Sequence, residues 1–249
     1  MSLSLLPYSP NRLIPYVLRF FLPWACAGCR APLAGLEDDG FCGRCWLAIP
    51  RIQGPVCQFC GIPLKYGGGV CYACRNVPPP LLIRAAAEYH GVVPSAVYRY
   101  KYLGRKSLAR VFGAMLRYAW EQSPELQPID ALIPVPLYRK NERLRGYNQA
   151  ELLACELGRE ISRPVLPLLF RTRKTPSQIK MNRDKRKENV RNAFALHPIA
   201  LAKRESLKGR SYLLIDDVCT TTSTLAECAI ALHRAGIRSV RALVLARDL

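Results

Sequence analysis

The chain has 249 residues, of which half are hydrophobic, and a formal net charge of +19 from 37 basic and 18 acidic residues. This hydrophobic content is enough for a buried core and excludes disorder over the whole chain. The sequence has no apolar run of about eighteen residues, which excludes a transmembrane segment. The basic excess favours polyanionic partners, namely nucleic acid, acidic lipid or phosphorylated substrates, without choosing among them.

The N-terminal stretch Leu13–Trp24 is apolar but is interrupted by Pro15, Arg19 and Pro23. A cysteine, Cys26, follows it where a secretory signal would have a small-residue cleavage site, so a secretory signal is a poor match. We therefore expect a cytoplasmic protein in which this stretch is an amphipathic helix packed on the rest of the chain. Contact with a membrane surface is the alternative.

Eight of the eleven cysteines form four C-x-x-C pairs, and the unit C-x-x-C-x-x-P-L…C-x-x-C occurs twice. Four thiolates in tetrahedral arrangement are typical of structural zinc. The repeat predicts two zinc ribbons in series, although a crossed arrangement, with the first pair joined to the third and the second to the fourth, is also open. The predicted ligands are Cys26, Cys29, Cys42 and Cys45 in the first repeat and Cys57, Cys60, Cys71 and Cys74 in the second.

Pro78, Pro79 and Pro80 then interrupt the chain. A proline run joins neither a helix nor a central strand, so it predicts a stiff spacer at a domain boundary. We expect an N-terminal helix and double ribbon over residues 1–76, a linker over 77–80 and a second domain over 81–249.

From residue 81 the pattern alternates between strand and helix, which predicts an α/β domain with a mostly parallel sheet flanked by helices. One helix is expected to start near Pro94, and further helices are expected over residues 107–120, 146–161 and 225–235. Strands are expected over 83–89, 129–135, 165–170, 211–215 and 239–246.

The most informative stretch is Leu213–Leu225, in which an apolar strand is followed by Asp216 and Asp217, a run of hydroxyl residues and a helix. A turn that opens a helix presents unpaired N–H groups and partial positive charge to an anion. The carboxylates are placed to accept hydrogen bonds from sugar hydroxyls at the carboxyl end of a strand, where open α/β sheets bind ligands. A capped helix without a ligand is the alternative.

This stretch resembles the phosphoribosyl-pyrophosphate (PRPP) motif of type I phosphoribosyltransferases. The resemblance implies that Asp216 and Asp217 hold the ribose and that Mg²⁺ accompanies the pyrophosphate. The residues that would surround the 5-phosphate are Val218, Cys219, Thr220, Thr221, Thr222, Ser223 and Thr224. The family usually has glycine at the position of Thr222, and glycine allows a positive φ and close backbone approach. Either the turn has a shape that threonine can adopt, or phosphate affinity is reduced.

Basic residues follow the strand that ends at Pro134-Val135-Pro136, and a cation at that edge could contact pyrophosphate. The residues are Arg139, Lys140, Arg143 and Arg145. The segment Arg145-Gly146-Tyr147-Asn148-Gln149, together with the paired cysteines, resembles the ComF family, a phosphoribosyltransferase-like group linked to natural competence and DNA uptake. A solvated basic helix start is the alternative.

The segment Arg171–Arg191 is the most basic part of the chain and includes Lys180, Arg183, Arg186 and Lys187. The resemblance implies a flexible loop that closes over the substrate. The same charge density also suits the backbone of single-stranded nucleic acid, and a solvated charged loop is the alternative.

Two hypotheses follow. The first is a PRPP-binding, phosphoribosyltransferase-like protein of the ComF type that acts in DNA uptake, with competence-machinery proteins as partners. The second is a single-stranded DNA-binding competence factor that keeps the fold without transferase turnover. No segment identifies an acceptor, so the sequence leaves the reaction open.

Overall fold

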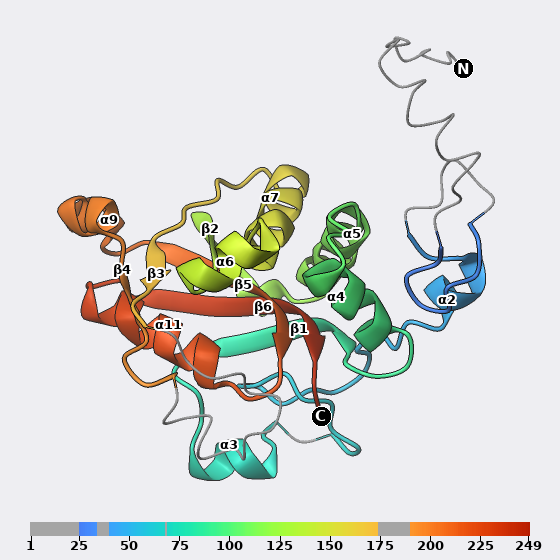
Figure 1. Cartoon of the computed structure of the whole chain (residues 1–249). Helices are drawn as coiled ribbons and strands as arrows, with labels where there is room; N and C mark the ends of the chain where they lie inside the picture. Colours follow the sequence, from blue (N-terminus) through green and yellow to red (C-terminus); the bar gives the residue numbers. More distant parts are fainter. Residues whose placement is uncertain (1–24, 34–39, 68, 174–189) are drawn as a thin grey trace, which may run out of the picture.

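The computed structural model describes residues 25–33, 40–67, 69–173 and 190–249. Its centre is a four-stranded, all-parallel sheet with the strand order β1-β6-β5-β2 (Figure 1). The central strands are buried on both faces, because Leu213 and Ile215 of β5 pack on one side and Tyr212 and Leu214 on the other. The strands are β1 (Leu82–Glu88), β2 (Ala131–Pro134), β5 (Ser211–Cys219) and β6 (Ser239–Arg247).

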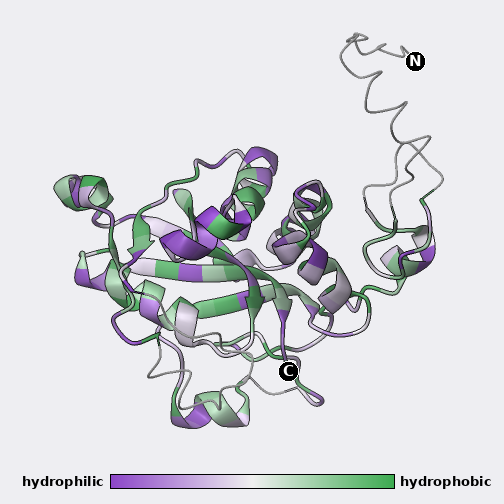
Figure 2. Ribbon diagram, in the orientation of Figure 1, coloured by the Kyte–Doolittle hydropathy of each residue, from purple (hydrophilic) through white to green (hydrophobic). Residues whose placement is uncertain are grey.

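Helices cover both faces of this sheet, with α4, α5 and α7 on one side and α11 on the other (Figure 1). Their apolar stripes meet the apolar strands, and the polar residues of the helices lie toward the outside (Figure 2). The bounds are α4 (Val93–Tyr102), α5 (Leu108–Glu121), α7 (Gln149–Glu160) and α11 (Ser223–Arg234). None of the helices in the described ranges has the length and apolar character needed to cross a membrane.

Shorter elements connect these layers. A second, antiparallel sheet consists of β3 (Leu169–Arg171) and β4 (Phe194–Leu196). The remaining elements are α2 (Gly43–Leu47), α3 (Tyr72–Asn76), the 3-10 helix η2 (Pro124–Leu126), α6 (Arg139–Arg145), α9 (Pro198–Ala202) and α10 (Arg204–Leu207).

The two ribbons pack on the α/β core in different ways. The core of the first is continuous with that of the large domain, and the rings of Phe41 and Phe112 lie 6.3 Å apart between their centroids. The second forms a small cluster of its own around Cys57, Cys60 and Cys74. Zinc is therefore expected to matter more for the internal stability of the second ribbon, which has little other core.

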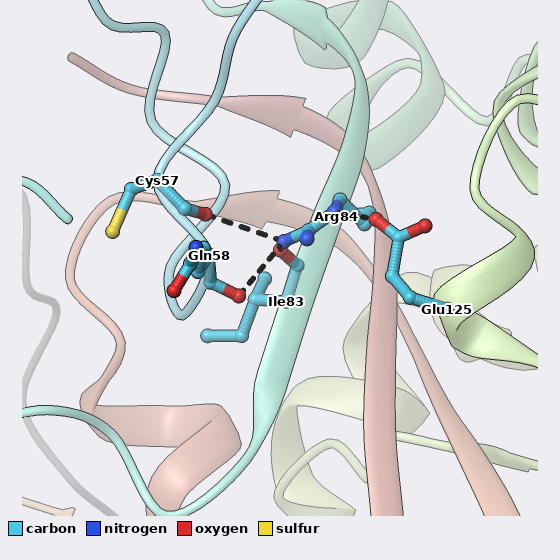
Figure 3. Close-up of polar contacts among 5 residues, drawn as sticks. All are labelled: Cys57, Gln58, Ile83, Arg84 and Glu125. Carbon is cyan, nitrogen blue, oxygen red and sulfur yellow. Dashed lines mark hydrogen bonds and ion pairs between the residues drawn. The ribbon is translucent and has the colours of Figure 1, made fainter. Parts of the chain in front are cut away.

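The segment that joins the ribbons and the start of the second ribbon cover the outer edge of β1. The N–H of Ile83 donates to Phe59 O at 2.8 Å, and Glu88 N–H donates to Pro50 O at 2.8 Å. Figure 3 shows Arg84 reaching the carbonyls of Cys57 and Gln58, each 3.3 Å from its Nη1, while its Nε pairs with Glu125. These hydrogen bonds satisfy backbone groups that the edge strand β1 would otherwise expose.

The fold class predicted from the sequence is confirmed, but two element boundaries were wrong. A single helix was expected over 146–161, whereas Gly146 ends α6 with φ of +78° and α7 begins at Gln149. A strand was expected over 165–170, but Val165 forms only an isolated bridge with Leu132. The strand proper is β3, which pairs with β4.

Two other elements were predicted to be shorter than they are. The strand expected to end at Ile215 continues to Cys219, and the helix expected from Leu225 begins at Ser223. The N-terminal stretch Leu13–Trp24 lies outside the described residues.

Candidate functional site

The acidic pair lies where β5 extends beyond its neighbour β2. Pairing between the two strands ends at Pro134 and Ile215, while β5 continues beside β6 as far as Cys219. Asp216 and Asp217 therefore occupy the carboxyl edge of the sheet, where they line a cleft of about 950 Å³. This is the edge at which parallel α/β sheets bind ligands.

Lys101, in the last turn of α4, pairs with Asp217 across the cleft. Its Nζ lies 2.8 Å from Oδ1 of Asp217, and the two side chains are 22% and 8% exposed. Burial alone would lower the pKa of Lys101, but the charge of Asp217 and the hydrogen bond to it outweigh burial, so the pKa is raised. Lys101 therefore remains a cation and neutralises one of the two carboxylates.

The other carboxylate, Asp216, is only partly compensated by the positive charges of Lys101 and Arg171. Burial, followed by the negative charge of Asp217, raises the pKa of Asp216 to about 7. A cation that approaches a carboxyl group with a raised pKa stabilises its ionised form. Carboxylate oxygens are hard ligands, so this side of the cleft fits Mg²⁺ or a Mg²⁺–phosphate complex.

The turn after the acidic pair has a shape that threonine adopts without strain. Thr222, at the N-cap of α11, has φ of −71° and ψ of −4°. Within the described part of the chain, the backbone N–H groups of residues 220–224 donate to no backbone carbonyl of a turn, loop or cap. Unpaired N–H groups at the start of a twelve-residue helix form an anion-binding arrangement.

Two arginines line the same cleft. Arg145 ends α6 and lies over the ring of Tyr102, with its guanidinium carbon 4.9 Å from the centroid. Arg171 belongs to β3, although the sequence had placed it in a basic arm. The cleft thus has carboxylates on one strand and cations on three separate elements.

The other basic residues of α6 lie elsewhere. Lys140 and Arg143 are exposed and do not line the cleft. Arg139 lines a neighbouring, mostly apolar cavity of about 580 Å³. Of the four cations predicted to meet pyrophosphate, the structure brings Arg145 to the acidic pair.

The segment Arg145–Gln149 anchors the turn between α6 and α7. Asn148 caps α7 by accepting from Ala150 N–H at 3.1 Å and donates to Val135 O at 3.1 Å. The Tyr147 hydroxyl donates to Tyr100 O, and the Tyr100 hydroxyl donates to Gln149 O at 2.9 Å. These bonds hold the turn against α4, and the Gln149 side chain lines the cleft.

The eight predicted metal ligands form two clusters, one in each repeat, so the crossed arrangement is wrong. Within each cluster the sulfur atoms all lie within 4.8 Å of one another. The Sγ atoms of Cys29 and Cys42 are 3.8 Å apart, and those of Cys60 and Cys71 are 3.7 Å apart. Tetrahedral zinc with Zn–S bonds of about 2.3 Å requires sulfurs about 3.8 Å apart. Both clusters therefore fit structural zinc.

Some site residues were beyond the sequence reasoning. Lys101 was missed, although a cation on the buried stripe of α4, one turn after Val97, is a signal of a buried partner. Gln149 belongs to the segment Arg145–Gln149 that the sequence singled out, but no role in the cleft was predicted for its side chain. Arg247 was also missed, and no local pattern marks it. Lys180, Arg183, Arg186 and Lys187 lie outside the described residues.

The comparisons with known proteins agree with this architecture. The sequence profile of the family described as "Double zinc ribbon domain" matches residues 17–75. DNA utilization protein YhgH of Escherichia coli O6:H1 is 32% identical over 234 residues, which cover 92% of this chain and 99% of that protein. Competence protein F of Haemophilus influenzae is 32% identical over 233 residues, covering 91% and 98%. Competence protein ComFC of Bacillus subtilis is 27% identical over 208 residues, covering 80% of each.

The structure thus defines an α/β protein in which two four-cysteine ribbons are joined to a parallel-sheet domain with an acidic and basic cleft. The chain belongs to the competence protein F (ComF) family, as its agreement with Competence protein F over nearly the whole length of both proteins shows. The family predicted from the cysteine repeat and from Arg145–Gln149 is confirmed.

Solved structures with a similar arrangement are more distant. Glutamine PRPP amidotransferase from Bacillus subtilis, complexed with ADP and GMP, is 15% identical with a TM-score of 0.39 over 59% of this chain and 30% of that chain. Adenine phosphoribosyltransferase from Thermoanaerobacter pseudethanolicus is 13% identical with a TM-score of 0.34 over 59% and 83%. At these scores neither similarity bears on function.

Proposed function

We propose that the cleft binds PRPP or a closely related sugar phosphate together with Mg²⁺. The observation that carries the proposal is the meeting of Asp216 and Asp217 with the start of α11 and with cations from three other elements in one cleft of about 950 Å³. A sugar phosphate with a pyrophosphate group needs hydroxyl acceptors, an anion site and cations at separate positions.

The roles of the residues follow from where they lie. Asp216 and Asp217 accept hydrogen bonds from the ribose hydroxyls. The N–H groups and hydroxyls of residues 220–224 surround the 5-phosphate. Arg145 and Arg171 face the pyrophosphate, and Mg²⁺ neutralises part of the pyrophosphate charge when it is bound.

Binding depends on the ionised form of the acidic pair. The pKa of Asp216 is raised to about 7 in the protein without ligand. Its carboxyl group therefore releases a proton when it accepts a hydrogen bond from a ribose hydroxyl or when Mg²⁺ binds nearby. Affinity should therefore rise with pH up to about 8.

Titration calorimetry of PRPP with Mg²⁺ tests the proposal. Asp217→Asn should weaken binding at least about tenfold, since each charge-assisted hydrogen bond contributes about 1.5–3 kcal/mol. Glu205→Gln, which alters an exposed carboxylate on α10, should bind as wild type does. Equal affinity in wild type and Asp217→Asn, or no binding in either, would refute the proposal.

A second function, binding of single-stranded DNA, is favoured by an exposed aromatic and basic surface beside the cleft. The rings of Tyr98 and Tyr102 lie 5.3 Å apart and are exposed by 56% and 55%. Arg99, Arg105 and Lys106 line a hollow of about 420 Å³ at the end of the same helix. Exposed aromatic faces next to cations are the usual means of binding a flexible single strand.

Filter binding of an oligonucleotide at several salt concentrations tests this second function. Tyr98→Ala and Tyr102→Ala should each weaken binding, by about 1–3 kcal/mol per stacked base. Tyr118→Ala, at a comparably exposed tyrosine on α5, is the control. If affinity is independent of salt, or if all three variants lose it equally, the surface is not the binding site.

A further inference from the structure

The hollow at the end of α4 collects positive charge without acidic residues in its walls. Arg99, Arg105 and Lys106 line it beside the apolar side chain of Leu103, and its volume is about 420 Å³. None of the described residues that line it is acidic. Like charges held close together repel one another, so this hollow favours an anion.

A tight turn between α4 and α5 brings these cations together. Gly104 has φ of +65°, a conformation that residues with a side chain rarely adopt. The turn returns the chain on itself, so that Arg105 N–H donates to Arg99 O at 3.3 Å. Ser107 follows as the N-cap of the 14-residue helix α5, and its side chain makes no capping hydrogen bond. A hydroxyl donor and the positive end of a helix dipole therefore lie beside the three cations.

The side chain of Arg99 is not needed to complete the end of α4. The carbonyl of Arg99 accepts from Leu103 N–H at 3.1 Å and from Arg105 N–H at 3.3 Å, so backbone groups satisfy it. The Nε of Arg99 is buried and has no hydrogen-bond partner among the described residues. A buried donor of this kind is unfavourable unless it meets an acceptor, and an oxyanion in the hollow would supply one.

The hollow is a different site from the cleft, although the two are neighbours. Gly104 lines both of them, whereas Asp216 and Asp217 line the cleft and not the hollow. Tyr102 also lines the cleft, and its ring lies 5.3 Å from that of Tyr98 on the same helix. An anion in the hollow would therefore lie near the exposed aromatic pair and away from the carboxylates.

We propose that the hollow is a phosphate site separate from the cleft. The Nε of Arg99 and the hydroxyl of Ser107 donate to the phosphate oxygens, while Arg105 and Lys106 contribute positive charge. The phosphate belongs to the backbone of a single strand whose bases stack on the exposed aromatic pair of α4. This source rests on the second proposed function, whereas the site itself does not. Free inorganic phosphate has the same chemistry, and the experiments below distinguish the two sources.

The first test measures urea unfolding of the full chain in inorganic phosphate and in chloride at equal ionic strength. An anion that binds the folded protein raises the unfolding midpoint. Arg99→Met is compared with wild type and with Arg163→Met, which removes the same charge at an exposed position after α7. Phosphate should raise the midpoint less in Arg99→Met than in the other two proteins. Phosphate bound in the cleft contributes equally to all three and does not affect the comparison.

The second test measures filter binding of oligothymidylate over a range of salt concentrations. Arg99→Met should weaken binding about tenfold at low salt, as expected for the loss of one charge-assisted hydrogen bond. Its plot of log affinity against log salt should be shallower by about 0.7, the contribution of one phosphate of a single strand. Arg163→Met should have nearly the slope and affinity of wild type.

The two measurements together decide the site and its source. Changes in both support a phosphate of the strand, and a loss of the phosphate effect with an unchanged salt slope supports a free phosphate compound. Arg99→Met that matches Arg163→Met in both measurements overturns the proposal. If Arg99→Met fails to fold, Lys106→Gln, at an exposed position, is compared in its place.

Failure of the two proposed functions can be told apart from failure of this site. Neither measurement uses PRPP, so a wild type that does not bind PRPP counts against the cleft alone. A wild type that does not bind oligothymidylate counts against the second function, and the comparison in phosphate then decides whether the hollow binds an anion.

Discussion

Replacing Lys101 by methionine should destabilise the protein by about 2 kcal/mol, because it leaves Asp217 buried and unpaired. Removing one partner of a fully buried ion pair costs about 3–5 kcal/mol. The cost here is lower because Lys101 is 22% exposed and because Asp217 Oδ1 also accepts from Val218 N–H at 2.6 Å. Methionine retains most of the apolar contacts of the lysine stem.

Urea unfolding at pH 8, where carboxylates are ionised, measures this cost as a shift in midpoint at constant slope. Lys208→Met is the control, since its ion pair with Glu205 is 2.7 Å long but lies at the surface, with the side chains 44% and 75% exposed. That change should leave the unfolding midpoint nearly unchanged, because an exposed ion pair contributes little to stability. The double variant Lys101→Met/Asp217→Asn should recover most of the loss. A loss below about 0.5 kcal/mol for Lys101→Met, or a double variant as unstable as the sum of the single ones, would show that Asp217 is not held by Lys101.

Three further predictions concern the metal sites, the carboxyl group of Asp216 and the turn that follows the acidic pair. Protein purified without added zinc should contain two zinc ions per chain by elemental analysis, and folded protein without metal would contradict the two four-cysteine sites. Because the folded pKa of Asp216 lies near 7, above its usual 3.8, its contribution to stability is full below about pH 3.8 and is lost as pH rises through about 7. As pH rises from 5 to 8, the free energy of unfolding of Asp216→Asn should therefore increase by about 2–3 kcal/mol relative to that of wild type, as measured by urea unfolding. If the difference in unfolding free energy between the two proteins stays constant with pH, the raised pKa is ruled out. Thr222→Gly should lower stability by less than about 1 kcal/mol, because φ is already negative at Thr222 and glycine adds backbone freedom. A gain in PRPP affinity in that variant would mean that Thr222 obstructs the phosphate.

The elements that could be predicted from the sequence are those whose chemistry is local. The repeated cysteine unit determines both sulfur clusters, because each metal site is complete within about twenty residues of chain. The acidic pair and the hydroxyl run are contiguous, so their position at a strand end and a helix start follows from hydrophobic patterning. In each case a short stretch contains both the element and its side chains.

The errors have physical causes in particular residues. Pro167 lacks an N–H and divides the apolar run over 165–170, so Val165 bridges β2 while Leu169 begins a different sheet. Gly146 was predicted to begin a helix, but its φ of +78° ends α6 instead. A proline or a glycine within an otherwise uniform pattern thus ends the element there.

The parts that sequence reasoning could not supply are contacts across long separations. Lys101 and Asp217 are more than a hundred residues apart, and Arg247 contacts a turn that precedes it by a whole helix and loop. Such pairs depend on the strand order β1-β6-β5-β2, which brings the end of β6 beside the end of β5. Topology of this kind is not determined by local composition.

The most direct measurement is a crystal structure of the protein soaked with PRPP and Mg²⁺. The proposed function predicts the 5-phosphate at the N–H groups of residues 220–224, the ribose hydroxyls on Asp216 and Asp217, and the pyrophosphate toward Arg145. Density for the ligand at another place, or a turn left without ligand at concentrations that saturate binding in solution, would contradict it.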